Sequence, residues 1–342
     1  MKVNVWNTIQ QLSKERGVDK HVIINAIEES LRVVSAKYFD EDEKVHIQFK
    51  PEKGELRVYS VKQITRNPSN PATEISLQQA KKIDATAEPG QYIEIDLPSD
   101  TLGRIAAQAA KQVIFQKVRT AEQERVYANF SSRIGEVVTG VMRRMEAKRH
   151  IILEVNKTEV MLPEREKIPG EHFKRGDRVK GVIIHVYREA KGPQVVISRT
   201  DNSFLRKLLE IEIPEIAGGS IEIKTIIRQP GERAKVAVYT EEKDIDPIGA
   251  CIGIKGNRIL SISKELEGEK VDVVKWSQDP AEYAKAALSP AKVESVKIQD
   301  EDKKLLQARV PRDQLSLAIG KKGLNVRLAS KLVGWKIDIN NP

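Results

Sequence analysis

The sequence has a single cysteine, few aromatic residues and no long apolar run. Cys251 has no second cysteine to pair with, so an internal disulfide and a cysteine-based metal cluster are both excluded. No apolar stretch reaches the roughly 18 residues that cross a bilayer, and residues 1–17 lack the apolar core of a secretory signal. We therefore expect a cytoplasmic protein without a membrane segment, in which Cys251 is a packed apolar side chain.

The sequence also lacks the common catalytic patterns. It contains no G-x-x-x-x-G-K-[ST] loop, no G-x-G-x-x-G turn, no H-E-x-x-H pair and no Cys/His grouping with zinc spacing. The acidic run at 40–43 could suggest a magnesium cluster, but adjacent residues point to different sides, which favours a solvated loop. We expect no enzymatic activity, no cofactor and no metal.

What the chain does have is an excess of positive charge, a net +9 over 342 residues. The excess is concentrated in residues 131–200, which hold fifteen basic and nine acidic side chains. A positive centre suits a polyanion such as RNA, although a modest basic balance also keeps many proteins soluble.

The first 200 residues show two kinds of periodicity. Residues 19–39 place apolar side chains on one helical stripe, and alternating segments at 44–49 and 55–61 predict a β-hairpin. Residues 101–130 have almost no helix breaker and predict one long helix. Five short β-rich pieces within 133–199 then predict a small closed barrel of the OB type.

Beyond Asp201 the sequence repeats itself. The segments 246–276 and 313–340 each contain a Gly-x-x-Gly tetrad, and the two tetrads lie 67 residues apart. Each unit reads as helix, strand, strand, helix, glycine turn, helix and strand, with Asp-Pro pairs at 246–247 and 279–280 suited to helix starts. This order predicts two copies of one small fold, with helices on one face of a three-stranded sheet.

A Gly-x-x-Gly turn between two helices lets the backbone approach a sugar-phosphate chain, because glycine has no Cβ and tolerates positive φ. The N–H groups at the start of the following helix attract phosphate, and Lys255, Lys321 and Lys322 add positive charge at the turns. Bases are expected in the apolar groove beside each turn. We predict its lining and edge from Ile252, Ile259, Ile319, Arg258 and Arg327. The alternative is that these glycines only end helices, but their duplication favours RNA.

Side chains outside the two glycine turns are further candidates for RNA contact. The basic segment 228–235 is either a solvated β-turn or a further RNA contact. In the barrel, cations could follow the RNA and rings could stack on bases. These candidates are Arg188, Lys191 and Arg199, with His150, His185 and Tyr187 as the rings.

Four segments resemble the family of bacterial NusA transcription elongation factors. They are GRIAAQAAKQVIFQKVR (103–119), DPIGACIGIKGNRI (246–259), GEKVDVVKW (268–276) and LSLAIGKKGLNVRLASKLVGWKIDI (315–339). The resemblance covers essentially the whole chain. It implies an α+β multidomain fold: a mixed α/β domain at 1–130 that docks on RNA polymerase, an S1-type OB barrel at 131–200, and two tandem type II KH domains at 201–277 and 278–342.

The same resemblance implies that the last three domains hold nascent single-stranded RNA. It implies roles in pausing, intrinsic termination and, with other Nus factors, antitermination, by a protein that is expected to be a monomer. The RNA contacts carried over are Gly253, Ile254, Lys255, Gly256, Arg258, Gly320, Lys321, Lys322, Gly323 and Arg327, with Arg199 and Arg228 in addition.

Two other functions use similar modules. A phosphorolytic exoribonuclease carries KH before S1, after large catalytic domains, whereas the order here is the reverse and residues 1–130 offer no phosphate-binding or metal constellation. A ribosome-assembly or translation factor would grip RNA in the same way. Association with RNA polymerase or with ribosomal subunits separates these interpretations.

Overall fold

The computed structural model describes residues 45–50, 55–96, 99–146 and 149–340, together with His21, Ile24, Asn25 and Glu29. Apart from those four residues, the predicted helix at 19–39 lies outside the described part of the chain, as does the acidic run at 40–43. The chain forms two compact units, residues 1–125 and 126–342. Within the described residues, every helix is too short or too polar to span a membrane.

The first unit contains a four-stranded sheet, and its strands are β1 (Val45–Lys50), β2 (Glu55–Thr65), β3 (Glu74–Ser76) and β4 (Tyr92–Asp96). Strands β1 and β2 pair antiparallel, which confirms the predicted hairpin. Helix α3 (Leu77–Ile83) follows β3 and is capped by the Ser76 hydroxyl, which accepts from the Gln79 N–H. Ile64 of β2, Ala80 of α3 and Ile93 of β4 belong to one buried cluster, so the helix packs against the sheet.

Helix α4 runs unbroken from Ser99 to Phe130, so the predicted long helix is confirmed. Its last turn belongs to the second unit, because Val126, Tyr127 and Phe130 pack against the core of the following barrel. The division between the units therefore falls at 125/126, slightly before the boundary expected at residue 130.

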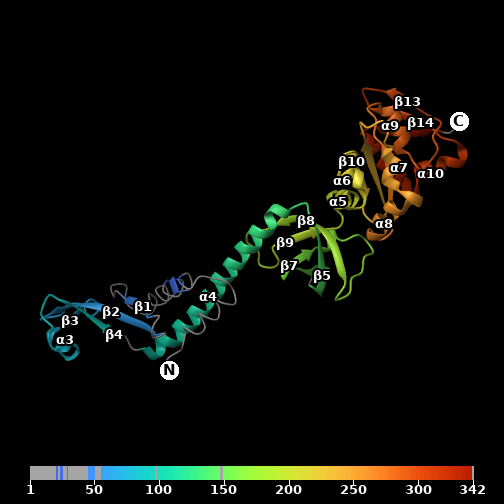
Figure 1. The fold of residues 1–342 in the computed structure, drawn as a ribbon. Helices are drawn as coiled ribbons and strands as arrows, with labels where there is room; N and C mark the ends of the chain where they lie inside the picture. Colours follow the sequence, from blue (N-terminus) through green and yellow to red (C-terminus); the bar gives the residue numbers. More distant parts are fainter. Residues whose placement is uncertain are drawn as a thin grey trace. The chain divides into compact units, whose positions relative to one another are not determined.

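The barrel follows α4 in the chain (Figure 1). Five strands close the barrel in the order β5-β6-β7-β9-β8. They are β5 (Val137–Met145), β6 (Ile151–Val155), β7 (Thr158–Leu162), β8 (Arg178–Val186) and β9 (Val195–Ser198). Each coincides with one of the predicted β-rich pieces. Gly140 and Gly181 lie in neighbouring strands, and a Cβ on either would come within 2.8 Å of a core side chain, so glycine is needed where the strands cross closely.

The first repeat follows the barrel and is built as the sequence predicts. Its elements are α5 (Asn202–Glu212), α6 (Pro214–Ala217), β10 (Glu222–Gln229), β11 (Arg233–Tyr239), α7 (Pro247–Ile252), α8 (Asn257–Glu265) and β12 (Lys270–Lys275). Strand β11 pairs antiparallel with β10 and parallel with β12.

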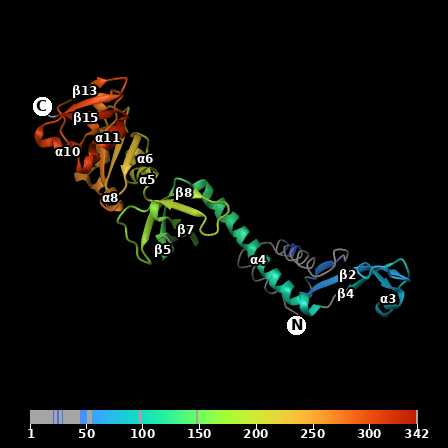
Figure 2. The same ribbon diagram turned by 180° about the vertical axis from the view of Figure 1, so that it is seen from behind.

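The second repeat has the same topology. Its elements are α9 (Pro280–Ala287), β13 (Ser295–Asp300), β14 (Leu305–Arg309), α10 (Leu315–Ile319), α11 (Leu324–Val333) and β15 (Lys336–Asn340). Its helices α10 and α11 and its outer strands β13 and β15 are labelled in Figure 2. The central strand β14 again pairs antiparallel on one side and parallel on the other. Asp246 and Asp279 cap α7 and α9, each accepting a backbone N–H two residues on, with proline at the first helical position.

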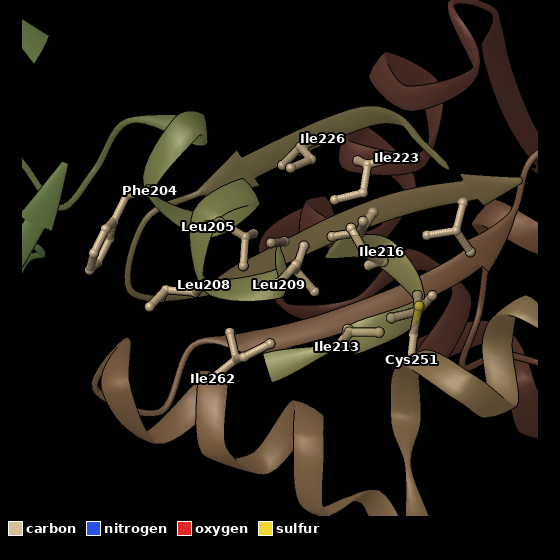
Figure 3. Packing of buried hydrophobic residues seen from close by; sticks show 14 of the residues in the cluster. Phe204, Leu205, Leu208, Leu209, Ile213, Ile216, Ile223, Ile226, Cys251 and Ile262 are labelled. Carbon is tan, nitrogen blue, oxygen red and sulfur yellow. The ribbon is translucent and has the colours of Figure 1, made fainter. Parts of the chain in front are cut away.

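The core of the first repeat lies between its helices and one face of its sheet (Figure 3). Leu205 and Leu209 of α5 lie on the side of the strands that carry Ile223 and Ile226, whereas Phe204 points away from those strands. Cys251 is fully buried in the same cluster, and this burial raises the pKa of its thiol to about 12. The expectation that Cys251 is a packed apolar side chain is confirmed.

The opposite face of that sheet is also covered, which the sequence pattern does not predict. Ala237 and Val274 belong to the same buried cluster as the helices α9 and α11 of the second repeat. Lys235 is fully buried on this face, where its Nζ donates to Asp272 at 2.9 Å and to the Ser289 carbonyl at 2.8 Å. The two repeats therefore pack as one body rather than as independent modules.

Candidate nucleic-acid interface

The two glycine turns have the same backbone conformation. The first glycines, Gly253 and Gly320, have φ, ψ values of 75°, 177° and 74°, 172°. The last glycines, Gly256 and Gly323, are left-handed at 78°, 12° and 72°, 15°. One lysine in each turn also has positive φ, 52° in the first and 53° in the second. This close agreement between turns 67 residues apart indicates one repeated structural motif and not two unrelated helix ends.

Close approach explains why the first glycine of each turn has no side chain. A Cβ on Gly253 would stand 2.5 Å from the Asn257 Oδ1 and 2.8 Å from the Arg258 Cγ. A Cβ on Gly320 would stand 2.8 Å from the Asn325 backbone nitrogen. The backbone of each turn thus lies directly over the start of the next helix, where N–H groups are available to an anion.

The predicted cations of both turns point into solvent. Lys255, Lys321, Lys322 and Arg327 are exposed, and none forms an ion pair within the described residues. Ile254 is 83% exposed, which is unusual for a large apolar side chain. Such a surface fits single-stranded RNA, because the cations can attract its phosphates and the isoleucine can contact its bases.

A groove of about 470 Å³ opens beside the first turn, and it is lined by Gly249, Ala250, Gly253, Ile254, Asn257 and Arg258. Of the predicted apolar lining, Ile252 and Ile319 are each 38% exposed. Ile259 is partly buried and packs against the core of its own repeat. The structure therefore brings most of the predicted site residues together at the turns.

The Arg258 side chain, predicted at the groove edge, is hydrogen-bonded within the protein. Its Nη1 donates to the Glu215 carboxylate at 2.9 Å and to the Ala250 carbonyl. The matching position in the second repeat is Asn325, a fully buried residue that sequence analysis missed. Its amide donates to the carbonyls of Leu317 and Ala318 and so fixes the second turn from inside. The 67-residue offset was the one signal that could have found it.

Arg199 is not available to RNA, which corrects the sequence-based expectation. Its side chain is 3% exposed and donates to the Glu171 carboxylate at 2.7 Å and to the Glu265 carboxylate at 3.0 Å. It also donates to the backbone carbonyls of Lys180 and Glu265. Because these partners come from the barrel and from α8, Arg199 joins the barrel to the first repeat.

Arg228 is likewise buried, and the prediction that it contacts RNA is corrected in the same way. It forms a two-bond ion pair with Glu269 at 2.6 and 2.8 Å, and both side chains are fully buried. Of the other cations in the basic segment 228–235, Arg233 pairs with Asp272 at 3.2 Å and Lys235 is buried. The cations of this segment therefore face the protein, whereas Gln229 and Glu232 at the turn are exposed.

Comparisons with known proteins show which family the chain resembles. Family models match in three places: the NusA N-terminal domain over residues 4–124, the NusA-like first KH domain over 199–276, and the NusA-like second KH domain over 280–342. The transcription termination/antitermination protein NusA of Halalkalibacterium halodurans is 43% identical over 341 residues, covering 100% of this chain and 89% of the relative. The chain belongs to the NusA family.

Two further NusA proteins agree with this assignment. The Bacillus subtilis protein is 42% identical over 341 residues, with 100% of this chain and 91% of the relative covered. The Thermus thermophilus protein is 39% identical over 339 residues, with 96% and 87% covered. The predicted family and fold class are confirmed, and the two repeats of this NusA-family chain are its KH domains, KH1 and KH2.

The barrel of this NusA-family chain carries a small exposed aromatic group. His185 and Tyr187 are exposed at the end of β8, in edge-to-face contact with ring centroids 4.2 Å apart. Beside them the Arg188 guanidinium lies 5.5 Å from the Tyr127 ring centroid. His150 is less accessible, and its Nδ1 lies 3.3 Å from the Glu164 backbone N–H, which donates to it. The proposed stacking role is therefore better placed at His185 and Tyr187.

Two carboxyl groups near the interface have shifted pKa values, Glu171 between the barrel and the first repeat and Glu215 near the first glycine turn. Burial raises the pKa of Glu171 above its ordinary value, even though the Arg199 hydrogen bonds oppose this shift. Near the first glycine turn the pKa of Glu215 is lowered, first by its own backbone N–H and then by the hydrogen bond from Arg258. Glu215 thus stays charged and keeps Arg258 paired.

Proposed function

We propose that this protein binds nascent single-stranded RNA through its two KH glycine turns and associates with bacterial RNA polymerase. In this role it modulates pausing, termination and antitermination. The observation that carries the proposal is the repeated turn, in which bare backbone, exposed lysines and a helix start occur twice in the same geometry. The names of the relatives, transcription termination/antitermination proteins, support the transcriptional role over a role in translation or RNA degradation.

The proposal includes a physical account of the grip. The sugar-phosphate chain lies against Gly253 and Gly320, where no Cβ holds it away, and its phosphates face the starts of α8 and α11. The lysines of the turns neutralise phosphate charge without reading sequence. Bases then reach the groove beside Ile254.

The remaining parts of the proposal concern assembly and location. We infer a monomer that works in the cytoplasm, with other Nus factors as further partners and without catalysing a reaction of its own. Support comes from the absence of the common catalytic patterns in the sequence and from the family assignment.

The first prediction tests the cationic turns. Replacing Lys255, Lys321 and Lys322 together by aspartate should weaken binding of a single-stranded RNA oligonucleotide by about tenfold or more at 0.15 M salt, because phosphate attraction turns into repulsion. Fluorescence anisotropy measures the affinity. The three side chains are exposed, so the thermal unfolding midpoint should not change.

A matched control separates the turns from overall charge. Lys285, Lys297 and Lys303 are exposed KH2 lysines on α9, on β13 and after β13. Their joint replacement by aspartate removes the same charge and should cost much less RNA affinity. Equal losses in the two variants, or an unchanged affinity in the first, would reject the proposed grip.

A further inference from the structure

KH1 and KH2 share a backbone but differ in charge around the turn. Residues 244–266 of KH1 hold three basic and three acidic side chains, whereas the equivalent residues 311–333 of KH2 hold five basic and one acidic. The only acidic residue of the KH2 segment is Asp313. Long-range attraction for phosphates is therefore much stronger at KH2.

The exposed cations at the turns follow the same asymmetry. Lys321, Lys322 and Arg327 of KH2 are exposed and form no ion pair within the described residues. In KH1, Lys255 is likewise exposed and without an ion pair to any described residue, but Arg258 is paired with Glu215 at 2.9 Å. Each unpaired cation that meets a phosphate releases counterions, so most of this contribution should come from KH2.

KH1 has instead an uncharged hydrogen-bonding group at its groove. Asn257 is exposed, lines the 470 Å³ groove and makes no hydrogen bond to another described residue. Its Oδ1 leans over Gly253, 2.5 Å from where a Cβ would stand. At the equivalent position KH2 has Leu324, which is buried and has no polar side-chain atom.

A carboxamide and an ammonium group read different parts of RNA. The carboxamide of asparagine presents one acceptor and two donors side by side, a pattern that fits some base edges and not others. A lysine ammonium attracts every phosphate alike. The geometry points to a division of labour: KH1 discriminates between bases through Asn257, and KH2 supplies the phosphate attraction. This inference rests on the proposed function, since it assigns parts of the same RNA grip.

Two variants of the full-length protein test the division. Asn257→Ala should lower the enrichment of the preferred nucleotides by about tenfold in sequencing of RNA bound from a random-sequence single-stranded pool, because the discriminating hydrogen bonds are lost. The slope of log affinity against log salt should stay unchanged. A triple change of Lys321, Lys322 and Arg327 to glutamine should reduce that slope by about 2 and leave the nucleotide preference intact.

Controls keep the outcomes distinct. Gln299→Ala removes an exposed carboxamide from β13 of KH2 and should change neither readout. Selections run at low salt, with protein concentrations adjusted to bind equal fractions of the pool. No RNA binding by the unmodified protein would reject the proposed function itself. Three outcomes would reject the division while leaving RNA binding in place. They are RNA binding without any nucleotide preference, a preference that is unchanged in Asn257→Ala, and a preference that is lost in the triple variant.

Discussion

At the scale of single residues, the two glycines of each turn differ in backbone conformation and in surroundings. Gly253 and Gly320 have positive φ with ψ near 180°, a region that is open essentially to glycine alone. Gly256 and Gly323 lie in the left-handed region, which other residues enter at a cost of about 1–2 kcal/mol. The surroundings differ too, because a Cβ on Gly320 meets backbone and a Cβ on Gly323 meets nothing within 4 Å.

We therefore predict that Gly320→Ala destabilises the protein more than Gly323→Ala. Both variants carry backbone strain, about 1–3 kcal/mol each, but only the first also forces the turn away from the start of α11. Urea unfolding followed by circular dichroism measures the two losses. Equal losses would show that α11 shifts without cost and that the contact at Gly320 is unimportant.

Residue type alone could not separate the cations that point outward from those that are buried. The exposure of Lys255, Lys321 and Lys322 was predictable, since they lie in a turn between helices. The burial of Arg199 and Arg228 was not. Their carboxylate partners Glu171 and Glu269 lie 28 and 41 residues away, so no local pattern relates them.

At the scale of elements, a buried guanidinium lies at the junction between the barrel and KH1. Arg199 follows β9 and connects Glu171 of the barrel with Glu265 at the end of α8. The Glu171 side chain is fully buried and also accepts from the Ile168 N–H at 3.0 Å. Removing Arg199 would leave this carboxylate buried without a cation, which is far costlier than losing an exposed ion pair.

We predict that Arg199→Met destabilises the second unit by about 3–5 kcal/mol, and more at pH 8 than at pH 5. The pKa of Glu171 is already raised by burial, so the folded state holds the proton more tightly than the unfolded chain does. Stability from this group therefore falls as pH rises through the range between the unfolded and folded pKa. Loss of Arg199 raises the folded pKa further and widens that range.

Urea unfolding at the two pH values measures the effect. The double variant Arg199→Met, Glu171→Met should recover much of the stability and lose the added pH dependence, because the carboxylate that had lost its cation is removed as well. A loss in Arg199→Met that is independent of pH, or that the second substitution deepens, would show that the guanidinium acts through packing alone.

At the scale of the whole molecule, the two KH domains form one body with unequal faces. The face of the KH1 sheet that carries Ala237 and Val274 is covered by KH2. The corresponding strands of KH2 carry Arg309, Lys336 and Asn340, all exposed and polar. These polar side chains are therefore in contact with solvent.

The division at 125/126 leads to a prediction about separated units. A fragment of residues 126–342 should bind single-stranded RNA with an affinity within about threefold of the full chain, because both turns and the barrel lie within it. Residues 1–125 alone should associate with RNA polymerase in a nuclease-treated pull-down. RNA binding that needs both fragments, or polymerase binding by 126–342 only, would relocate these contacts.

The sequence by itself determined the order of the elements, the duplication and the two glycine turns. These features depend on periodicity, helix caps and backbone freedom, which act between residues close along the chain. Only the tertiary structure decided which cations remain exposed and that KH2 covers the KH1 sheet. Those outcomes depend on burial and on partners tens of residues away, and desolvation makes the difference between a buried ion pair and a free charge.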